Sequence, residues 1–226
     1  MSFTGSSVFA GMLKTAVNVH AGASDTSYKV IAFDAFSIFD LRPVSNLAEL
    51  FPGKSTNLMS AWRTRQFEYQ WLRILSNKYV DFWQITEDSL EFASKKSELQ
   101  MTSETRNKLM STYSHLSVWP DVQTSLCLLH NAGVRLGFLS NMTKKMLEFG
   151  LERANLNGTF EPVLSTDQIK TYKPTPLAYQ MATNAFVLAR HEILFVPFAS
   201  WDMAVSFIRL RLTSQYYPNI RSFSIS

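Results

Sequence analysis

Side chains that could carry nucleophilic and acid–base chemistry follow several apolar runs of the sequence. They stand at four places: Asp34, Ser140 with Asn141, Lys173, and Asp202. The apolar runs predict buried strands, and open parallel α/β sheets bind their ligands beyond the carboxyl ends of the strands. A carboxylate at such an edge is a candidate nucleophile. We therefore interpret Asp34, which follows the apolar run 30–33, as the group that attacks a substrate.

Each of these residues also has an ordinary structural interpretation. An Asp after a strand commonly caps a helix or forms a turn, and Ser140 and Asn141 could cap the helix that follows them. Lys173 stands before Pro174, as an ordinary loop lysine would. The functional interpretation depends on these side chains meeting at one edge of one sheet.

The elements that must position these residues alternate along the chain. Apolar runs predict strands at 30–33, 134–139, 162–164 and 193–196. Helical patterns occupy 122–131, 143–154 and 175–188. Strands that alternate with helices indicate βαβ crossovers and a parallel sheet. We expect an α/β fold whose core, a Rossmann-like parallel sheet with helices, is formed by residues 28–44 and 118–226.

The segment between the first two strands is different in character. After a connector from Pro43 to Lys54, helical patterns begin at Asn57 and continue at 81–93 and 103–113. We therefore expect residues 45–117 to be an inserted all-helical cap subdomain. Apolar residues on two faces of the helix that begins at Asn57 suit contact on two sides. That pattern fits a cap, and it fits the interface of a homodimer equally well.

Composition narrows the class of protein. Hydrophobic residues make up 46% and charged residues 18% of the 226 residues, as in ordinary globular proteins. The net charge of +4 comes from scattered basic residues, so nucleic acid is a poor partner, and no apolar stretch could span a bilayer. The single cysteine, Cys127, excludes an intramolecular disulfide, and its apolar helical surroundings predict that it is buried and inert. The four histidines lack the spacing of metal ligands.

Residues 1–27 are rich in Ser, Thr, Gly and Ala, and we expect them to form a disordered leader. Ala21-Gly22-Ala23 loosely resembles a signal-peptidase site. However, Lys14 interrupts the apolar run and no basic residue precedes that run. We therefore expect a cytoplasmic protein rather than an exported one.

The order of these motifs resembles the haloacid dehalogenase superfamily, and within it the type II branch, which is L-2-haloacid dehalogenase-like. The resemblance covers roughly residues 29–206. It is most specific in Ala61-Trp62-Arg63, Glu68-Tyr69-Gln70-Trp71-Leu72-Arg73, Leu139-Ser140-Asn141, Tyr172-Lys173-Pro174 through Tyr179, and Ser200-Trp201-Asp202. The resemblance implies a hydrolase that removes halide from small (S)-2-haloacids through an aspartyl ester, with neither metal nor cofactor.

The chemistry of halide displacement gives these residues roles. The Asp34 carboxylate would attack carbon, and Lys173 would keep Asp34 ionised. Asp202 is the candidate base that orients the water that hydrolyses the ester. A departing halide needs a cation or N–H donors, for which Arg63 and Asn141 are candidates.

The substrate itself needs its carboxylate held and its alkyl group enclosed. The Ser140 hydroxyl and backbone N–H groups near Ala35 and Phe36 could bind the carboxylate. The resemblance further implies that aromatic side chains shape the pocket: Phe36, Phe67, Phe82, Tyr179 and Trp201.

Two alternative functions remain open. A Mg²⁺-dependent phosphatase of the same superfamily would usually carry an acid two residues after the nucleophile, where this chain has the apolar Phe36. A catalytically impaired protein of the same fold is the second alternative. Pro197, Phe198 and Ala199 motivate it, because they stand where the family often has water-positioning Ser and Asn residues.

Overall fold

The computed structural model describes residues 28–48, 55–199, 201–202 and 213–214. The expected leader, residues 1–27, lies outside the described residues. At the centre of the fold is a parallel sheet in the order β3-β2-β1-β4-β5. Its strands are β1 (Val30–Phe33), β2 (Arg135–Ser140), β3 (Val163–Ser165), β4 (Ile193–Val196) and β5 (Thr213–Ser214). The predicted α/β class and parallel sheet are confirmed.

The central strands are apolar along their whole length because both faces of the sheet are covered. Every residue of β1 and β4 is buried. Alternating polar residues would therefore face the interior, which explains the continuous apolar runs in the sequence. In register, Phe33 of β1 lies beside Phe138 of β2 and Val196 of β4. Strands β1 and β4 therefore end at one level, and β2 continues two residues further, to Ser140. Asp34, Ser140 and Asn141 are thus brought to the same edge of the sheet.

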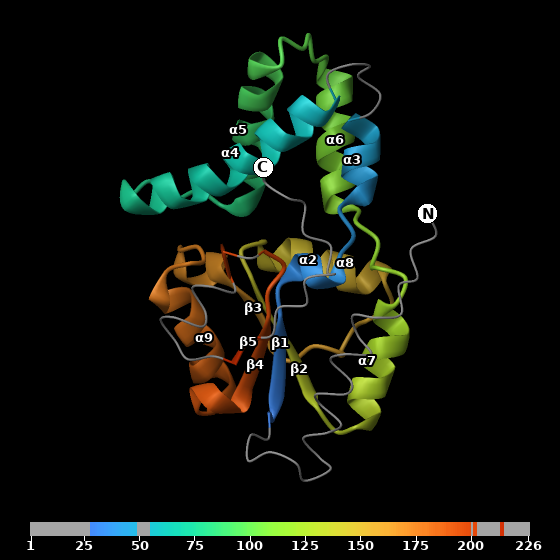
Figure 1. Cartoon of the computed structure of the whole chain (residues 1–226), viewed down its shortest axis with the longest axis vertical. Helices are drawn as coiled ribbons and strands as arrows, with labels where there is room; N and C mark the ends of the chain where they lie inside the picture. The colour runs from blue at the N-terminus through green and yellow to red at the C-terminus, as the bar shows by residue number, and fades with distance from the viewer. Residues whose placement is uncertain (1–27, 49–54, 200, 203–212, 215–226) are drawn as a thin grey trace.

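Helices cover both faces of this sheet. They are α7 (Val122–Asn131), α8 (Lys144–Arg153) and α9 (Pro176–Phe186), with the short η1 (Thr166–Ile169) and η2 (Arg190–Glu192). Figure 1 shows α7 and α9 on opposite sides of the sheet. Gly150 lets the backbone of α8 pack directly against the buried ring of Phe39, because a Cβ atom at this position would lie 2.6 Å from Cζ of that ring.

Four helices form a group beyond the carboxyl edge of the sheet (Figure 1). They are α3 (Arg42–Ala48), α4 (Ser55–Leu75), α5 (Phe82–Lys96) and α6 (Ser103–Ser114), and the short α2 (Ala35–Ile38) leads toward them. The described residues between 45 and 117 include no strand. Asp81 and Thr102 cap α5 and α6 by accepting hydrogen bonds from the backbone N–H groups of Gln84 and Thr105. We call this helical group the cap below.

The cap is tied to the sheet side of the molecule by two tyrosines. The Tyr79 hydroxyl donates to Oδ1 of Asp167 at 2.7 Å, and the Tyr172 hydroxyl donates to the backbone oxygen of Val80 at 2.7 Å. The two rings also stack, with centroids 5.2 Å apart. Tyr172 directly precedes Lys173, so these contacts join the cap to the loop that carries this lysine.

Two local predictions are wrong. Part of the expected connector from Pro43 to Lys54 is helical, because α3 begins at Arg42. Asp40 accepts hydrogen bonds from the Arg42 backbone N–H at 2.9 Å and from its Nε at 2.8 Å, which stabilises this helix start. Cys127 is exposed, whereas it was expected to be buried. The inner face of α7 is formed by Leu126 and Leu129 instead.

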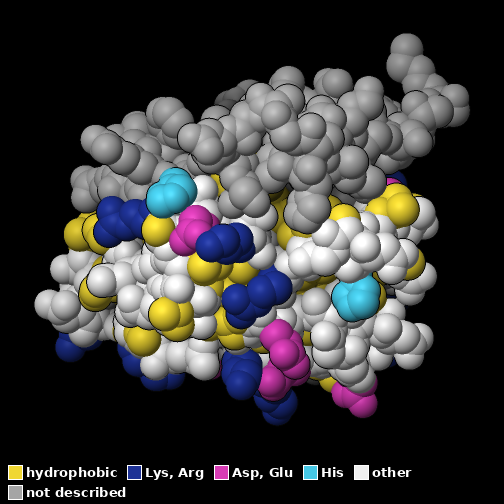
Figure 2. All heavy atoms as spheres, turned by 90° about the horizontal axis from the view of Figure 1, so that it is seen from below, with side chains coloured by type: hydrophobic (Ala, Val, Ile, Leu, Met, Phe, Trp, Pro, Cys, Tyr) yellow, Lys and Arg dark blue, Asp and Glu magenta, His cyan; other side chains and the backbone are white. Residues whose placement is uncertain are grey.

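Surface charge forms no continuous stripe on the face seen in Figure 2. Lys and Arg side chains lie in small groups there, with Asp and Glu side chains among them. Within the described ranges, no helix has the length and apolar character needed to cross a membrane.

Candidate active site

The site is built on the end of β1, where Asp34 follows Phe33. Asp34 caps α2, and its Oδ1 accepts a hydrogen bond from the Phe36 backbone N–H at 3.0 Å. Its own backbone N–H donates to the Val196 oxygen at 2.9 Å, which ties it to the end of β4. The structural interpretation of Asp34 as a helix cap is thus correct for one oxygen. The other oxygen, Oδ2, faces the site.

Lys173 reaches this oxygen from the loop between η1 and α9. Its side chain is only 1% exposed. The Nζ atom pairs with Oδ2 of Asp34 and lies 2.7 Å from Oδ2 of Asp202. One ammonium group therefore bridges two buried carboxylates that are far apart in the sequence.

Tyr179 completes this cluster from α9. Its hydroxyl donates a hydrogen bond to Oδ1 of Asp202. Burial and the neighbouring Asp202 charge raise the pKa of Tyr179 above its ordinary value, so the phenol keeps its proton. Both oxygens of Asp202 thus receive a donor, one from Tyr179 and one from Lys173.

The pKa values of this cluster reflect its net negative charge. Burial lowers the pKa of Lys173, but the two carboxylates outweigh burial and raise this pKa above its ordinary value. Burial raises the pKa of Asp202, the Lys173 charge opposes this, and the Asp34 charge adds to it. Because two carboxylates share one ammonium, the cluster holds its protons tightly, and Lys173 is charged at neutral pH.

The polar wall beside this cluster comes from the end of β2. Oδ1 of Asn141 accepts hydrogen bonds from the Lys173 backbone N–H at 2.8 Å and from Oγ1 of Thr166 at 3.2 Å. The Ser140 hydroxyl accepts a hydrogen bond from the Met142 backbone N–H at 3.1 Å, which stabilises the turn after β2. Ser140 also lines the cavity described below. Asn141 thus positions the backbone of the loop that carries Lys173.

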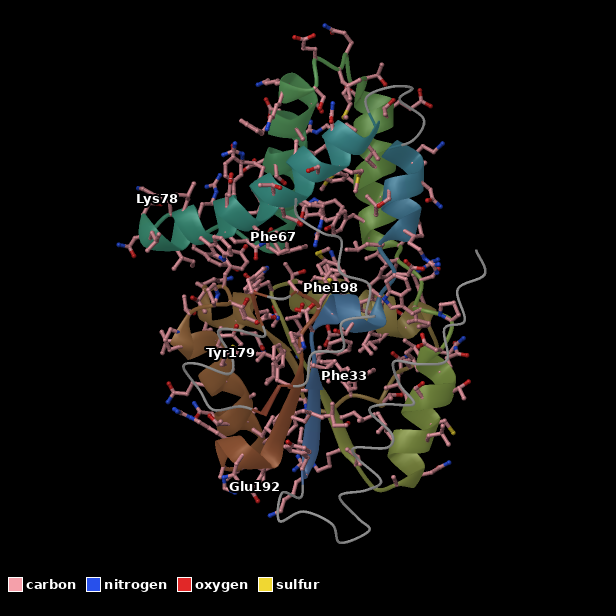
Figure 3. All side chains as sticks on the ribbon, in the orientation of Figure 1. Phe33, Phe67, Lys78, Tyr179, Glu192 and Phe198 are labelled. Atoms are coloured by element: carbon pink, nitrogen blue, oxygen red, sulfur yellow. The ribbon has the colours of Figure 1, made fainter. Side chains whose placement is uncertain are left out.

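These groups surround a cavity of about 20 Å³, which has room for roughly one water molecule. Its polar lining consists of Asp34, Gln70, Ser140, Asn141, Lys173 and Asp202. Its other walls are Phe36, Phe67, Phe82, Met142, Phe198, Ala199 and Trp201. Figure 3 shows Phe67 on α4 and Phe198 after β4 at the junction between the cap and the sheet. The site is therefore narrow and mostly apolar, and α4 and α5 of the cap form part of its wall.

Arg63 lies beside this cavity and does not itself line it. Its guanidinium carbon is 5.1 Å from the ring centroid of Phe36 and 5.0 Å from that of Phe67, and both rings face the cavity. Nη1 of Arg63 donates to Oε1 of Gln66 and to the Tyr113 hydroxyl, both at 2.6 Å. A cation is thus held in the cap, next to the aromatic walls.

Most of the predicted site residues meet around the cavity, and three do not line it. Asp34, Phe36, Phe67, Phe82, Ser140, Asn141, Lys173, Trp201 and Asp202 line it, whereas Arg63, Ala35 and Tyr179 do not. The Phe36 N–H, expected to hold a substrate carboxylate, is already bonded to Asp34. Tyr179 contacts Asp202 instead of shaping the pocket.

Several residues of the site were missed by the sequence analysis: Gln70 and Met142 in the lining, and Gln66 and Tyr113 around Arg63. Phe198 and Ala199, which it named only as replacements for water-positioning residues, line the cavity as well. Gln66 and Gln70 lie one helical turn apart on the inner face of α4, and both are buried. Polar residues at this spacing within an apolar helix face were the available signal. No three His, Cys, Asp or Glu side chains gather as metal ligands in the part of the chain described here.

Comparison with known proteins identifies the family. A sequence profile of the family described as haloacid dehalogenase-like hydrolase matches residues 61–205. The chain belongs to this family. Among relatives, it is 38% identical over 176 residues to the (S)-2-haloacid dehalogenase of Pseudomonas sp. (strain YL), which covers 77% of this chain and 76% of that protein. It is 35% identical to the (S)-2-haloacid dehalogenase 4A of Burkholderia cepacia, covering 78% of each.

Solved structures agree with this placement. The crystal structure of the L-2-haloacid dehalogenase RSc1362 matches with a TM-score of 0.79 at 35% identity, covering 84% of this chain and 86% of that one. The Xanthobacter autotrophicus L-2-haloacid dehalogenase with chloropropionic acid covalently bound gives a TM-score of 0.71 at 29% identity, covering 79% and 73%. The predicted membership of the type II branch of the haloacid dehalogenase superfamily is confirmed.

Removing the shared cation of this haloacid dehalogenase-like hydrolase would leave two buried carboxylates unpaired. We predict that Lys173→Met lowers the free energy of unfolding by about 3–5 kcal/mol at pH 8. The loss should be smaller at pH 5, because a buried carboxyl group without a counter-ion takes up a proton. Urea unfolding at the two pH values measures both effects.

The raised pKa of Lys173 determines how its contribution to the stability of the wild type changes with pH. Its stabilisation is present below the unfolded lysine pKa of about 10.4 and is lost as the pH rises through the folded value. Lys145→Met, which removes an exposed lysine of α8, is the matched control and should change stability little at either pH. An equal loss for Lys173→Met at pH 5 and pH 8 would contradict the shared-cation interpretation.

Proposed function

We propose that this chain is a hydrolytic dehalogenase of small (S)-2-haloacids that acts through an ester on Asp34. The observation that carries the proposal is the Lys173 ammonium, buried and shared by Asp34 and Asp202 at the edge of an aromatic cavity. It fits an ionised nucleophile beside a second carboxylate in a nearly dry site. The names of the relatives, (S)-2-haloacid dehalogenases, support the substrate class.

In the first step, a carboxylate oxygen of Asp34 attacks the carbon that bears the halogen, from the side opposite the halide. A carbon–oxygen bond forms, the carbon–halogen bond breaks, and the halide leaves with the bonding electrons. Lys173 pairs with Oδ2 of Asp34, and the Phe36 N–H fixes the carboxylate at Oδ1, so the nucleophile is oriented before substrate arrives.

The leaving halide requires positive charge or N–H donors close to where it departs. Nδ2 of Asn141 lies in the cavity wall and can donate a hydrogen bond. The Arg63 guanidinium stands behind the rings of Phe36 and Phe67, and it would have to reach between them to touch the halide. We assign halide binding to these two groups, with Arg63 contributing long-range attraction in a low-dielectric site.

The second step is hydrolysis of the ester by water. Asp202 accepts a proton from the water, whose oxygen attacks the ester carbonyl carbon of Asp34. The bond between the carbonyl carbon and the bridging oxygen breaks. The bridging oxygen leaves with the 2-hydroxyacid and takes up the proton held by Asp202, and the Asp34 carboxyl group releases its proton to solvent and is regenerated as a carboxylate. The donors to Asp202 from Tyr179 and Lys173 hold the base in place. Pro197 and Ala199 offer no polar side chain to this step.

The small cavity and its aromatic walls favour a short substrate. A cavity of about 20 Å³ must expand to admit a haloacid, and Phe36, Phe82 and Phe198 leave little room for a long alkyl chain. Ser140 is the candidate donor to the substrate carboxylate.

The decisive measurement is halide release from purified protein incubated with (S)-2-chloropropionate in the presence of a chelator. We predict chloride release by the wild type and a loss of at least about 1,000-fold in Asp34→Asn, because the neutral amide cannot displace halide. Mass spectrometry after acid quenching should find the substrate carbon skeleton on the peptide that contains Asp34. Chloride release that survives in Asp34→Asn would refute the assignment of the nucleophile.

Two other outcomes of the same assay point to the alternatives. Activity confined to phosphate esters with added Mg²⁺ would identify a phosphatase. A folded protein that releases neither halide from haloacids nor phosphate from phosphate esters would be a catalytically impaired member of the family.

Arg63 provides an independent test of halide stabilisation. We predict that Arg63→Met lowers kcat at least about 100-fold, as the loss of a transition-state charge contact would, while methionine keeps an unbranched apolar side chain at this position. The free energy of unfolding should fall by only about 1–2 kcal/mol, because Gln66 and Tyr113 lose one charged partner. Arg106→Met, which removes an exposed arginine of α6 that does not line the cavity, is the control. A loss of stability without a loss of kcat would make Arg63 structural.

We further propose that the chain acts in the cytoplasm as a homodimer. The single cysteine suits a reducing compartment. Two leucines at the end of α4 support the dimer, because Leu72 is 55% and Leu75 is 81% exposed. Sedimentation velocity should give a mass close to twice 25.8 kDa, and Leu75→Lys should shift it toward the monomer. A wild-type chain that sediments as a monomer at micromolar concentration would contradict the dimer.

A further inference from the structure

Gln70 is a buried polar residue of the cap for which the proposed reaction gives no role. It belongs to α4, its side chain is 1% exposed, and it lines the cavity that holds Asp34 and Lys173. A carboxamide so thoroughly removed from water must find partners for both its oxygen and its nitrogen. These partners determine which end of Gln70 faces the cavity wall.

The orientation of Gln70 follows from its own helix. Its Nε2 donates to the backbone oxygen of Gln66, one turn earlier, at 3.0 Å. Its Oε1 therefore points toward the end of β2, where it accepts a hydrogen bond from Nδ2 of Asn141 at 2.6 Å. A residue of the cap thus bonds directly to a residue of the sheet edge, inside the site.

Asn141 cannot turn its carboxamide around to escape this contact. Its Oδ1 already accepts from the Lys173 backbone N–H at 2.8 Å and from Oγ1 of Thr166 at 3.2 Å. The NH₂ group must therefore face Gln70 and the cavity. One of its N–H bonds goes to Gln70, and the Lys173 backbone oxygen lies 3.5 Å from Nδ2, at the outer limit of a hydrogen bond.

We propose that Gln70 is a positioning residue that competes with the departing halide for the N–H donors of Asn141. The inference rests on the proposed function, in which Asn141 stabilises the halide. A carbonyl oxygen carries partial negative charge, so a halide next to Asn141 either shares a donor with Gln70 or displaces it. In both cases the halide is held less tightly than an unopposed amide would hold it, which favours its release after each turnover.

The test compares chloride binding in the wild type, Gln70→Met and Gln70→Glu. Chloride affinity is measured by ³⁵Cl NMR line broadening, which does not require turnover. Met keeps the length of the side chain without the carbonyl, so the freed N–H should tighten chloride binding about fivefold, the net worth of one hydrogen bond. Glu keeps an acceptor and adds negative charge, so it should weaken chloride binding by about fivefold or more.

Chloride as a product inhibitor gives a second readout in the active enzyme. Its inhibition constant should fall in Gln70→Met in parallel with the dissociation constant. Gln123→Met, an exposed position on α7, is the matched control and should leave both constants unchanged. A role of Gln70 in cap docking alone would change the thermal midpoint of both Gln70 variants without moving chloride affinity in opposite directions.

The outcomes separate this inference from the proposed function. Chloride affinity in Gln70→Met within twofold of the wild type, or weaker, overturns the competition between Gln70 and halide. If Gln70→Met does not fold, Gln70→Glu decides, and unchanged or tighter chloride binding there overturns the proposal. Failure of the proposed function would appear differently, as a wild type that releases no halide from any 2-haloacid.

Discussion

One ammonium group shared by two buried carboxylates is the constraint on which the rest of this site depends. Lys173, Asp34 and Asp202 come from three segments that are far apart in the chain, and each would be costly to bury alone. Their pairing works only if the ends of β1 and β4 and the loop before α9 lie at one level. The parallel register of the sheet and the hydrogen bond from the Lys173 backbone N–H to Asn141 meet this requirement.

The cap supplies what the sheet edge lacks. The sheet side brings acids, an amide and a lysine, whereas α4 brings the aromatic wall of Phe67, the cation of Arg63 and the two buried glutamines. Gln66 holds Arg63, and its backbone oxygen accepts from Gln70, which bonds to Asn141. A chain of hydrogen bonds therefore runs from the cation of the cap to the polar residues of the sheet. Networks of this kind in a low-dielectric interior fix the geometry of a site strongly when every member is paired.

Sequence patterns predicted the sheet and the acidic cluster because buried parallel strands are continuous apolar runs that end at polar residues. The class of the fold, strands β1 to β4 and the meeting of Asp34, Lys173 and Asp202 follow from that regularity. Strand β5 (Thr213–Ser214) was not predicted, because its two residues form no apolar run. The partners of Arg63 and Asn141 could not be predicted in this way. Gln66 and Gln70 make their hydrogen bonds only because α4 packs against α5 and the end of β2. Likewise, no local pattern could tell that the Phe36 N–H is already taken by Asp34.

The two tyrosine contacts between the cap and the loop at 166–173 carry a consequence for substrate entry. The cavity is small, with room for roughly one water molecule, so a haloacid fits only if the walls that α4 contributes move away from the sheet edge. Tyr172 is bonded to the cap at Val80 and is the immediate neighbour of Lys173. Such a movement of the cap would pull on the backbone that carries Lys173 and would weaken the contact between its ammonium group and Asp34. The contact between Lys173 and Asp34 would then depend on the position of the cap, through Tyr172 and Val80.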